Sequence, residues 1–249
     1  LAVSACLSWP ALAEEADSGA IVAAQFAAGG NNQGVRASGA KGVCVKGTFT
    51  PAPGAAGLSK APHFAKPTPV TARFSMGGSS PKISDKAKPV TRGFAVRMSD
   101  GPSDMTFVVI SAPVFAARTP EQLLEFFKVR APGPDGKQDP EKIKAFGAQN
   151  PETTRQSAWL NARPVPASFA GVDYWSVQAY TLTNAKGTPT VARLKFVSAD
   201  KAGLSDDELK GKPDSFYADE LKARLEQGPA RFDLVAILAE PGDPTNDST

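Results

Sequence analysis

The chain has 249 residues, of which 41% are hydrophobic and 21% charged, so it is long enough to bury one sizeable core. Its net charge is only +3, and its lysines and arginines form no basic run interleaved with aromatic residues, which argues against nucleic-acid binding. No segment after the first residues approaches the ~20 apolar residues that a membrane span needs.

The N-terminus has the pattern of an export signal. Residues 1–12 (LAVSACLSWPAL) are mostly small and apolar, and they end in an A-x-A site before two glutamates. The pattern predicts a signal peptide over residues 1–13, clipped at its start, with cleavage after Ala13. A lipoprotein site at Cys6 is the alternative. Cleavage after Ala13 leaves Cys44 as the only cysteine, and we expect it to be a small buried residue rather than half of a disulfide.

The polar residues 14–33 predict a flexible lead-in to a domain spanning residues 34–249. Alternation of apolar and polar residues, with breaks rich in Gly and Pro, predicts four strands of an antiparallel meander. These strands cover residues 42–50, 70–76, 91–98 and 105–111.

Helical signals follow. A polar residue, a proline and a glutamate recur in that order at Thr119, Asp139 and Asn150, and each set predicts the start of a helix. Strands return at residues 174–184 and 190–198, joined by a hairpin turn. A helix over 214–227 and a strand over 230–239 complete the pattern. Seven strands around a helical insert predict an α+β fold built on an incomplete antiparallel barrel or a strongly curled sheet.

Several motifs, in a fixed order, resemble those of haem catalases. They are VTARFS at 70–75, RGFAVR at 92–97, SAPVF at 111–115, YTLTNAKG at 180–187 and LKF at 194–196. The chain is similar to the catalase-related peroxidases, a short periplasmic branch. The resemblance implies an eight-stranded catalase-like β-barrel, haem b, hydrogen peroxide, a small-molecule electron donor and a possible homo-oligomer. It also implies a downstream helix, absent from this chain, that carries the tyrosine ligand of the iron.

The resemblance also identifies the positions of the catalytic residues. Residues 36–42 (RASGAKG) match a motif in which a histidine moves the proton of the peroxide, and Gly39 stands at the position of that histidine. The distal asparagine falls on Ile110, or on Ser111 after a slip of one residue. Ser75 is expected to brace the histidine. The expected result is a degraded distal site with slow turnover.

Three residues are expected on the cofactor side. The resemblance places Arg36 and Arg73 at the haem propionates, a task that suits a fixed fork of donors, and Phe74 on the strand beside them. No metal ligand is expected in this chain, because His63 lies in a loop outside the pocket and Tyr217 reads as a packing residue. A haem-binding barrel without turnover, or a barrel for another apolar ligand, remain as alternatives.

Overall fold

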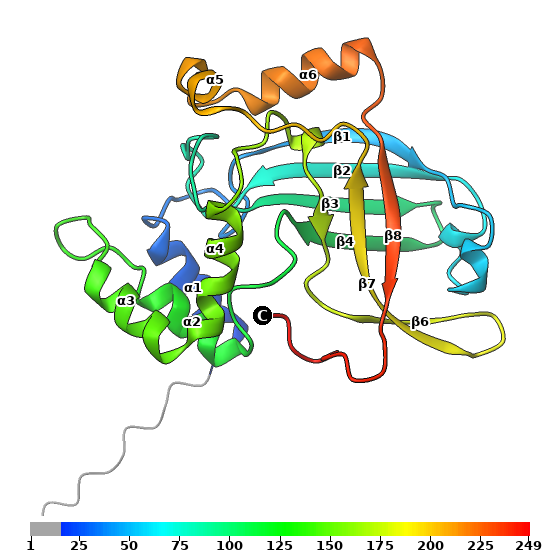
Figure 1. The fold of residues 1–249 in the computed structure, drawn as a ribbon, viewed down its shortest axis with the longest axis horizontal. Helices are drawn as coiled ribbons and strands as arrows, with labels where there is room; N and C mark the ends of the chain where they lie inside the picture. Colours follow the sequence, from blue (N-terminus) through cyan, green and yellow to red (C-terminus); the bar gives the residue numbers. More distant parts are fainter. Residues whose placement is uncertain (1–15) are drawn as a thin grey trace, which may run out of the picture.

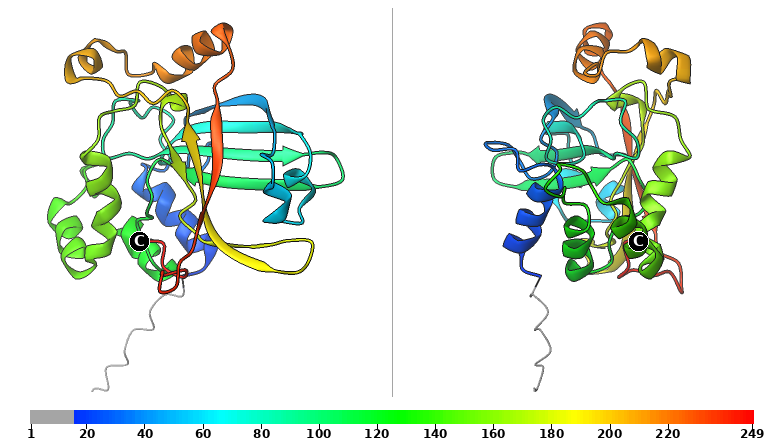
Figure 2. Two further views of the ribbon diagram at one scale, coloured as in Figure 1. Left: turned by 45° about the vertical axis from the view of Figure 1, so that its right-hand side comes forward. Right: turned by 90° about the vertical axis from the view of Figure 1, so that its left-hand side faces the viewer.

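The computed structural model describes residues 16–249, so the predicted signal peptide lies outside the described residues. These residues form one eight-stranded antiparallel sheet with helices along one side and at one end (Figures 1 and 2). The strands are β1 (Gly42–Phe49), β2 (Thr68–Met76), β3 (Arg92–Ser99), β4 (Asp104–Ile110), β5 (Tyr174–Trp175), β6 (Tyr180–Thr183), β7 (Pro189–Ser198) and β8 (Phe232–Leu238). The α-helices are α1 (Ser18–Ala28), α2 (Pro120–Lys128), α3 (Pro140–Gln149), α4 (Arg155–Asn161), α5 (Asp206–Gly211) and α6 (Tyr217–Gln227), joined by four short 3₁₀ helices, η1 (Ala55–Gly57), η2 (Pro62–Phe64), η3 (Pro151–Thr154) and η4 (Phe169–Gly171).

The sheet is strongly curled. Its strands follow the order β1-β2-β3-β4-β5-β7-β6, and β8 pairs with β7. Strands β2 and β8 are not neighbours in this order, yet the ring centroids of Phe74 on β2 and Phe232 on β8 lie 6.1 Å apart. The sheet therefore curls so that both strands face the same core. The predicted α+β fold, an incomplete antiparallel barrel with inserted helices, is confirmed.

The two faces of the sheet have different environments. The inner face carries the core, in which Phe74, Phe94 and Tyr174 are at most 6% exposed. The opposite face carries Cys44, Arg73, Ala95 and Val108, which lie directly across from one another on β1 to β4. We call this the open face, and Val108 is 65% exposed on it. Cys44 is exposed there rather than buried as predicted, because alternation along β1 turns it away from the core.

The predicted helix starts are correct for α2 and α3. The side chains of Thr119 and Asp139 accept hydrogen bonds from the first turns, and proline follows each of them. The third start gives the 3₁₀ helix Pro151–Thr154 before α4 begins. The predicted strand 174–184 is two strands, β5 and β6, because residues 176–179 leave the ladder.

Two helices differ from the sequence interpretation. The expected flexible lead-in contains α1, which Asp17 caps by accepting a hydrogen bond from Ala20 N at 2.6 Å. Its alanine-rich sequence has high helix propensity, and it packs on α2. Helix α5 was missed, although Ser205 and Glu208 form a capping box at its start. Among residues 16–249, no helix is long and apolar enough to cross a membrane.

Candidate functional site

The loop before β1 brings Gly39 against two open-face residues of β2. Gly39 has φ +64°, a conformation that glycine adopts without a steric penalty. A Cβ atom built on Gly39 would lie 3.0 Å from Ser75 Oγ and 3.3 Å from Arg73 Nη1. Gly39, Ser75 and Arg73, three of the residues predicted for the site, therefore lie side by side.

Arg73 lies at this site, within the electrostatic influence of Arg36. Arg73 donates a hydrogen bond from Nη2 to the carbonyl oxygen of Ala40 at 3.3 Å. Burial lowers the pKa of the Arg73 guanidinium from its ordinary value, and the positive charge of Arg36 lowers it further. Arg73 is partly buried and Arg36 is exposed, and two cations that act on each other in this way form a natural site for carboxylates.

The remaining predicted site residues divide between the two faces. Ile110 lies on the open face, paired with Gly93 and Trp175. Ser111 does not reach this face: it is 5% exposed, and its Oγ accepts a hydrogen bond from Arg92 N at 2.9 Å. Ser111 therefore braces the end of β4, which corrects its prediction as a catalytic residue.

Phe74 is also placed differently from the prediction. Its neighbours Arg73 and Ser75 point to the open face, so alternation along the strand turns Phe74 into the core. There its ring stacks on Phe94 with centroids 4.3 Å apart. Phe74 contributes to packing and makes no contribution to a cofactor surface on the open face.

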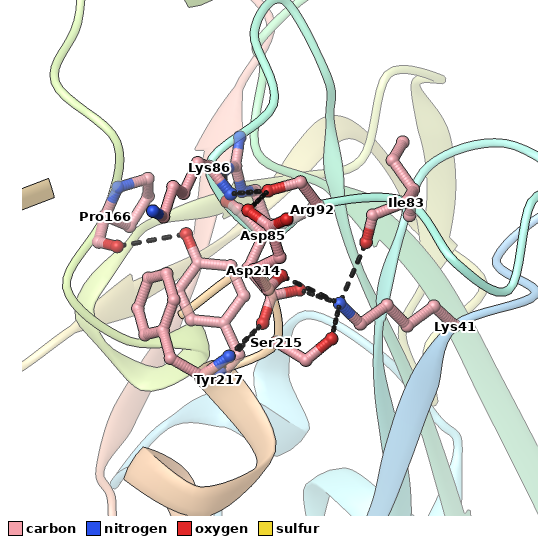
Figure 3. A network of polar contacts seen from close by, with 11 residues as sticks. Lys41, Ile83, Asp85, Lys86, Arg92, Pro166, Asp214, Ser215 and Tyr217 are labelled. Atoms are coloured by element: carbon pink, nitrogen blue, oxygen red, sulfur yellow. Dashed lines mark hydrogen bonds and ion pairs between the residues drawn. The ribbon is translucent and has the colours of Figure 1, made fainter. Parts of the chain in front are cut away.

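Sequence reasoning missed a polar network that connects Lys41, two residues after Gly39, with Asp85 and the start of α6 (Figure 3). Lys41 Nζ lies 2.7 Å from Asp85 Oδ1, and it donates to the carbonyl oxygen of Ile83 at 2.8 Å. The other carboxylate oxygen of Asp85 accepts the backbone N–H groups of Phe216 and Tyr217, at 2.7 and 2.9 Å. Asp85 therefore ties the Gly39 loop to the start of α6.

Arg92 and Tyr217 complete this network. Arg92 is 3% exposed and donates to the carbonyl oxygens of Val90 and Asp85, at 2.6 and 2.7 Å. The hydroxyl of Tyr217 donates to Pro166 O at 3.0 Å, and the residue is 1% exposed. Tyr217 is thus a packing residue, as the sequence predicts.

Tyr217 gives a testable dependence on pH. Burial raises the pKa of its phenol from 10.0 to about 12, an effect that the charge of Arg92 opposes. Between pH 10 and about pH 12, the Tyr217 phenol loses its proton in the unfolded chain but keeps it in the folded chain. The stability that Tyr217 contributes is therefore full below about pH 10 and is lost as the pH rises towards 12. We expect an ultraviolet titration to show a phenolate step near pH 12 that is absent in Tyr217→Phe. Identical titration curves for the two proteins would contradict this assignment.

The tyrosines and the histidine of this chain lie away from the open face. Tyr174 is buried and donates to Phe169 O at 2.7 Å, and Tyr180 packs on Phe107 of the inner face. The only histidine, His63, is 1% exposed, with Nε2 3.2 Å from Ser103 O. In residues 16–249 no group of three or more His, Cys, Asp or Glu side chains is arranged to hold a metal ion.

Comparisons with known proteins identify the family of the chain. Residues 34–232 match the catalase family. The chain is 33% identical over 224 residues to a catalase-related peroxidase of Synechococcus elongatus, covering 88% of this chain and 66% of that protein. It is 35% identical over 223 residues to a catalase-related peroxidase of Mycolicibacterium paratuberculosis, covering 88% and 70%.

Solved structures show the same fold. A bacterial catalase superposes with a TM-score of 0.74 at 21% identity, over 83% of this chain and 42% of that one. Catalase A from Saccharomyces cerevisiae gives a TM-score of 0.74 at 19% identity, over 84% and 45%. The chain thus spans about two thirds of the length of the related peroxidases and under half of these catalases. The family match and the two relatives establish that this chain belongs to the catalase family.

Proposed function

We propose that this chain forms the distal wall of a haem peroxidase that acts on hydrogen peroxide. The observation that carries the proposal is the position of Gly39, Arg73 and Ser75 together on the open face. These are the positions at which the family resemblance expects the distal base, a propionate ligand and the residue that braces the base.

The residues of the open face fit a flat, apolar cofactor with two carboxylates. Gly93 and Ala95 have no side chain beyond a methyl group, so they leave room for a ligand in the middle of the open face. The exposed Val108 lies beside Ala95. Arg73 supplies a positive charge on the open face, and the charge of Arg36 acts on it. A planar macrocycle such as haem b gains from burial against the apolar part, and its propionates gain from the paired guanidinium groups.

Bound haem would supply the redox chemistry towards peroxide, and the chain would supply binding and shape. Arg73 would hold a propionate, and Ile110 would exclude water from its side of the pocket. Ser75 would offer a hydroxyl. Gly39 has no group that can accept a proton, so proton transfer at this position would depend on water. Tyr174, Tyr180 and Tyr217 all face the interior, so none of them would hold the iron.

A haem-binding protein without turnover is the second candidate. The observation that favours it is the missing side chain at Gly39, because positioned acid–base groups contribute roughly 10²–10⁴-fold to a rate. For either function we propose export to the periplasm, which rests on the pattern of residues 1–13. A small-molecule reductant would be the electron donor of the peroxidase.

Binding of haemin tests the proposal. We expect the full protein to bind haemin with a shifted Soret band, and Arg73→Gln to weaken binding by roughly 10-fold, because a charge-assisted hydrogen bond to a propionate is lost. Phe74→Leu is the matched control on the same strand. It should cost about 1 kcal/mol of stability and leave the haemin affinity unchanged, since Phe74 faces the core.

The two substitutions separate the possible results. A spectrum of free haemin in the presence of the protein would exclude haem binding at this face. Equal loss of affinity in Arg73→Gln and Phe74→Leu would show that haemin binds elsewhere, or that both variants act through stability alone.

A further inference from the structure

The C-terminal segment returns towards helices α1 and α2 (Figure 1). Residues of these three segments line a groove that shares no residue with the Gly39 site. It encloses about 410 Å³. Ile21, Phe115, Leu123 and Val177 form apolar walls, while Arg118 and Asp247 also line the groove. Seven of its fourteen lining residues are apolar and seven are polar or charged. A volume of several hundred Å³ that combines apolar walls with polar groups suits a small amphipathic ligand.

Arginines converge on the C-terminal side of this groove. Arg118 Nε lies 2.9 Å from Asp247 Oδ2, and Arg193 Nη2 donates to the backbone oxygen of Asp247 at 2.8 Å. The pKa of the Asp247 carboxyl is held below its ordinary value, first by hydrogen bonds from Thr249 and then by the charges of Arg118 and Arg155. The structure therefore already shows this corner of the groove holding a carboxylate.

Arg118 retains capacity for a second carboxylate. Its side chain is 49% exposed even with Asp247 bound. The closest contact of this ion pair is through Nε, so the Nη edge of the guanidinium is the part that a ligand would bind. A guanidinium can bind two oxygens of one carboxylate through parallel hydrogen bonds, which fixes orientation as well as charge.

We propose that this groove binds a small amphipathic carboxylate. Its apolar body lies against Leu123 and Val177, and its carboxylate pairs with the Nη atoms of Arg118. Asp247 lines the groove beside Arg118, and its negative charge weakens the binding of the ligand carboxylate. The site shares no residue with the Gly39 site and does not depend on haem or on turnover.

Equilibrium binding of 2-naphthoate to the full protein tests the proposal, with 2-naphthamide as the uncharged probe. We expect naphthoate to bind at least ~10-fold more tightly than the amide, because only the acid makes charge-assisted hydrogen bonds to Arg118. Arg118→Gln should remove this preference. Asp247→Asn should strengthen naphthoate binding by a few-fold, since it removes a like charge beside the ligand.

The opposite signs of these two effects make the test decisive. Arg118→Gln and Asp247→Asn both break the ion pair between Arg118 and Asp247. Similar effects of the two on naphthoate binding would mean that Arg118 only holds the segment around Asp247 in place. That result would overturn the proposal, as would equal affinity for acid and amide. Arg97→Gln, which breaks the exposed pair with Asp104 elsewhere on the sheet, should leave binding unchanged. Loss of naphthoate binding in the presence of saturating haemin would assign the groove to the haem site instead.

Discussion

Replacing Gly39 by histidine is expected to raise oxygen evolution from hydrogen peroxide by at least ~100-fold in the haem-loaded protein. The expectation rests on the proposed function and on the geometry of the loop. The Cβ of the new residue would lie 3.0 Å from Ser75 Oγ, a tight contact that requires the Ser75 side chain to shift by a few tenths of an ångström. The imidazole then enters beside a hydroxyl that can orient it. The φ of +64° opposes this change, but histidine is among the residues that tolerate this conformation best.

Two controls separate chemistry from backbone strain. Gly39→Ala carries the same Cβ in the same backbone conformation but no base, and should leave oxygen evolution at the level of the parent protein. Gly136→His introduces a histidine at another position of positive φ, φ +74°, where no atom lies within 4 Å of a new Cβ. It too should change nothing. Equal rates for the parent and Gly39→His would show that the glycine is not what limits dismutation.

The sequence predicted well those elements that local patterns determine. Strands β1 to β4 were predicted because apolar and polar residues alternate along them, and α2 and α3 because Thr119 and Asp139 cap them. The same alternation could have placed Phe74 correctly. The motif match suggested Phe74 as a cofactor residue, but the period of a strand forces it to the face opposite Arg73 and Ser75.

Features that depend on distant partners could not be predicted. Asp85 lies in a polar loop and reads as a solvated residue, yet its partner N–H groups on Phe216 and Tyr217 are 131 and 132 residues away. Helix α1 is a similar case, since its stability depends on packing against α2 as well as on its own alanines. The capping box of α5 was a local signal that could have been recognised from Ser205 and Glu208.

Asp85→Ala is expected to lower the free energy of unfolding by about 3–5 kcal/mol. Asp85 is 1% exposed and serves two partners at once, the Lys41 ammonium and the N–H groups that open α6. Alanine leaves the lysine without its counter-charge and the helix start without an acceptor. Equilibrium denaturation in urea measures the change from the transition midpoint and slope.

The loss of stability depends on how deeply the carboxylate is buried, and a comparison of Asp85 with Asp104 can show this. Asp104 also forms a close ion pair, with Arg97 at 2.6 Å, but both side chains are about half exposed. Asp104→Ala should therefore cost no more than about 1 kcal/mol. Asp85→Asn should fall between the two alanine variants, because the amide oxygen still accepts from α6 while the charge that pairs with Lys41 is gone. A loss in Asp85→Ala as small as that in Asp104→Ala would mean that α6 and the Gly39 loop are held together by apolar packing instead.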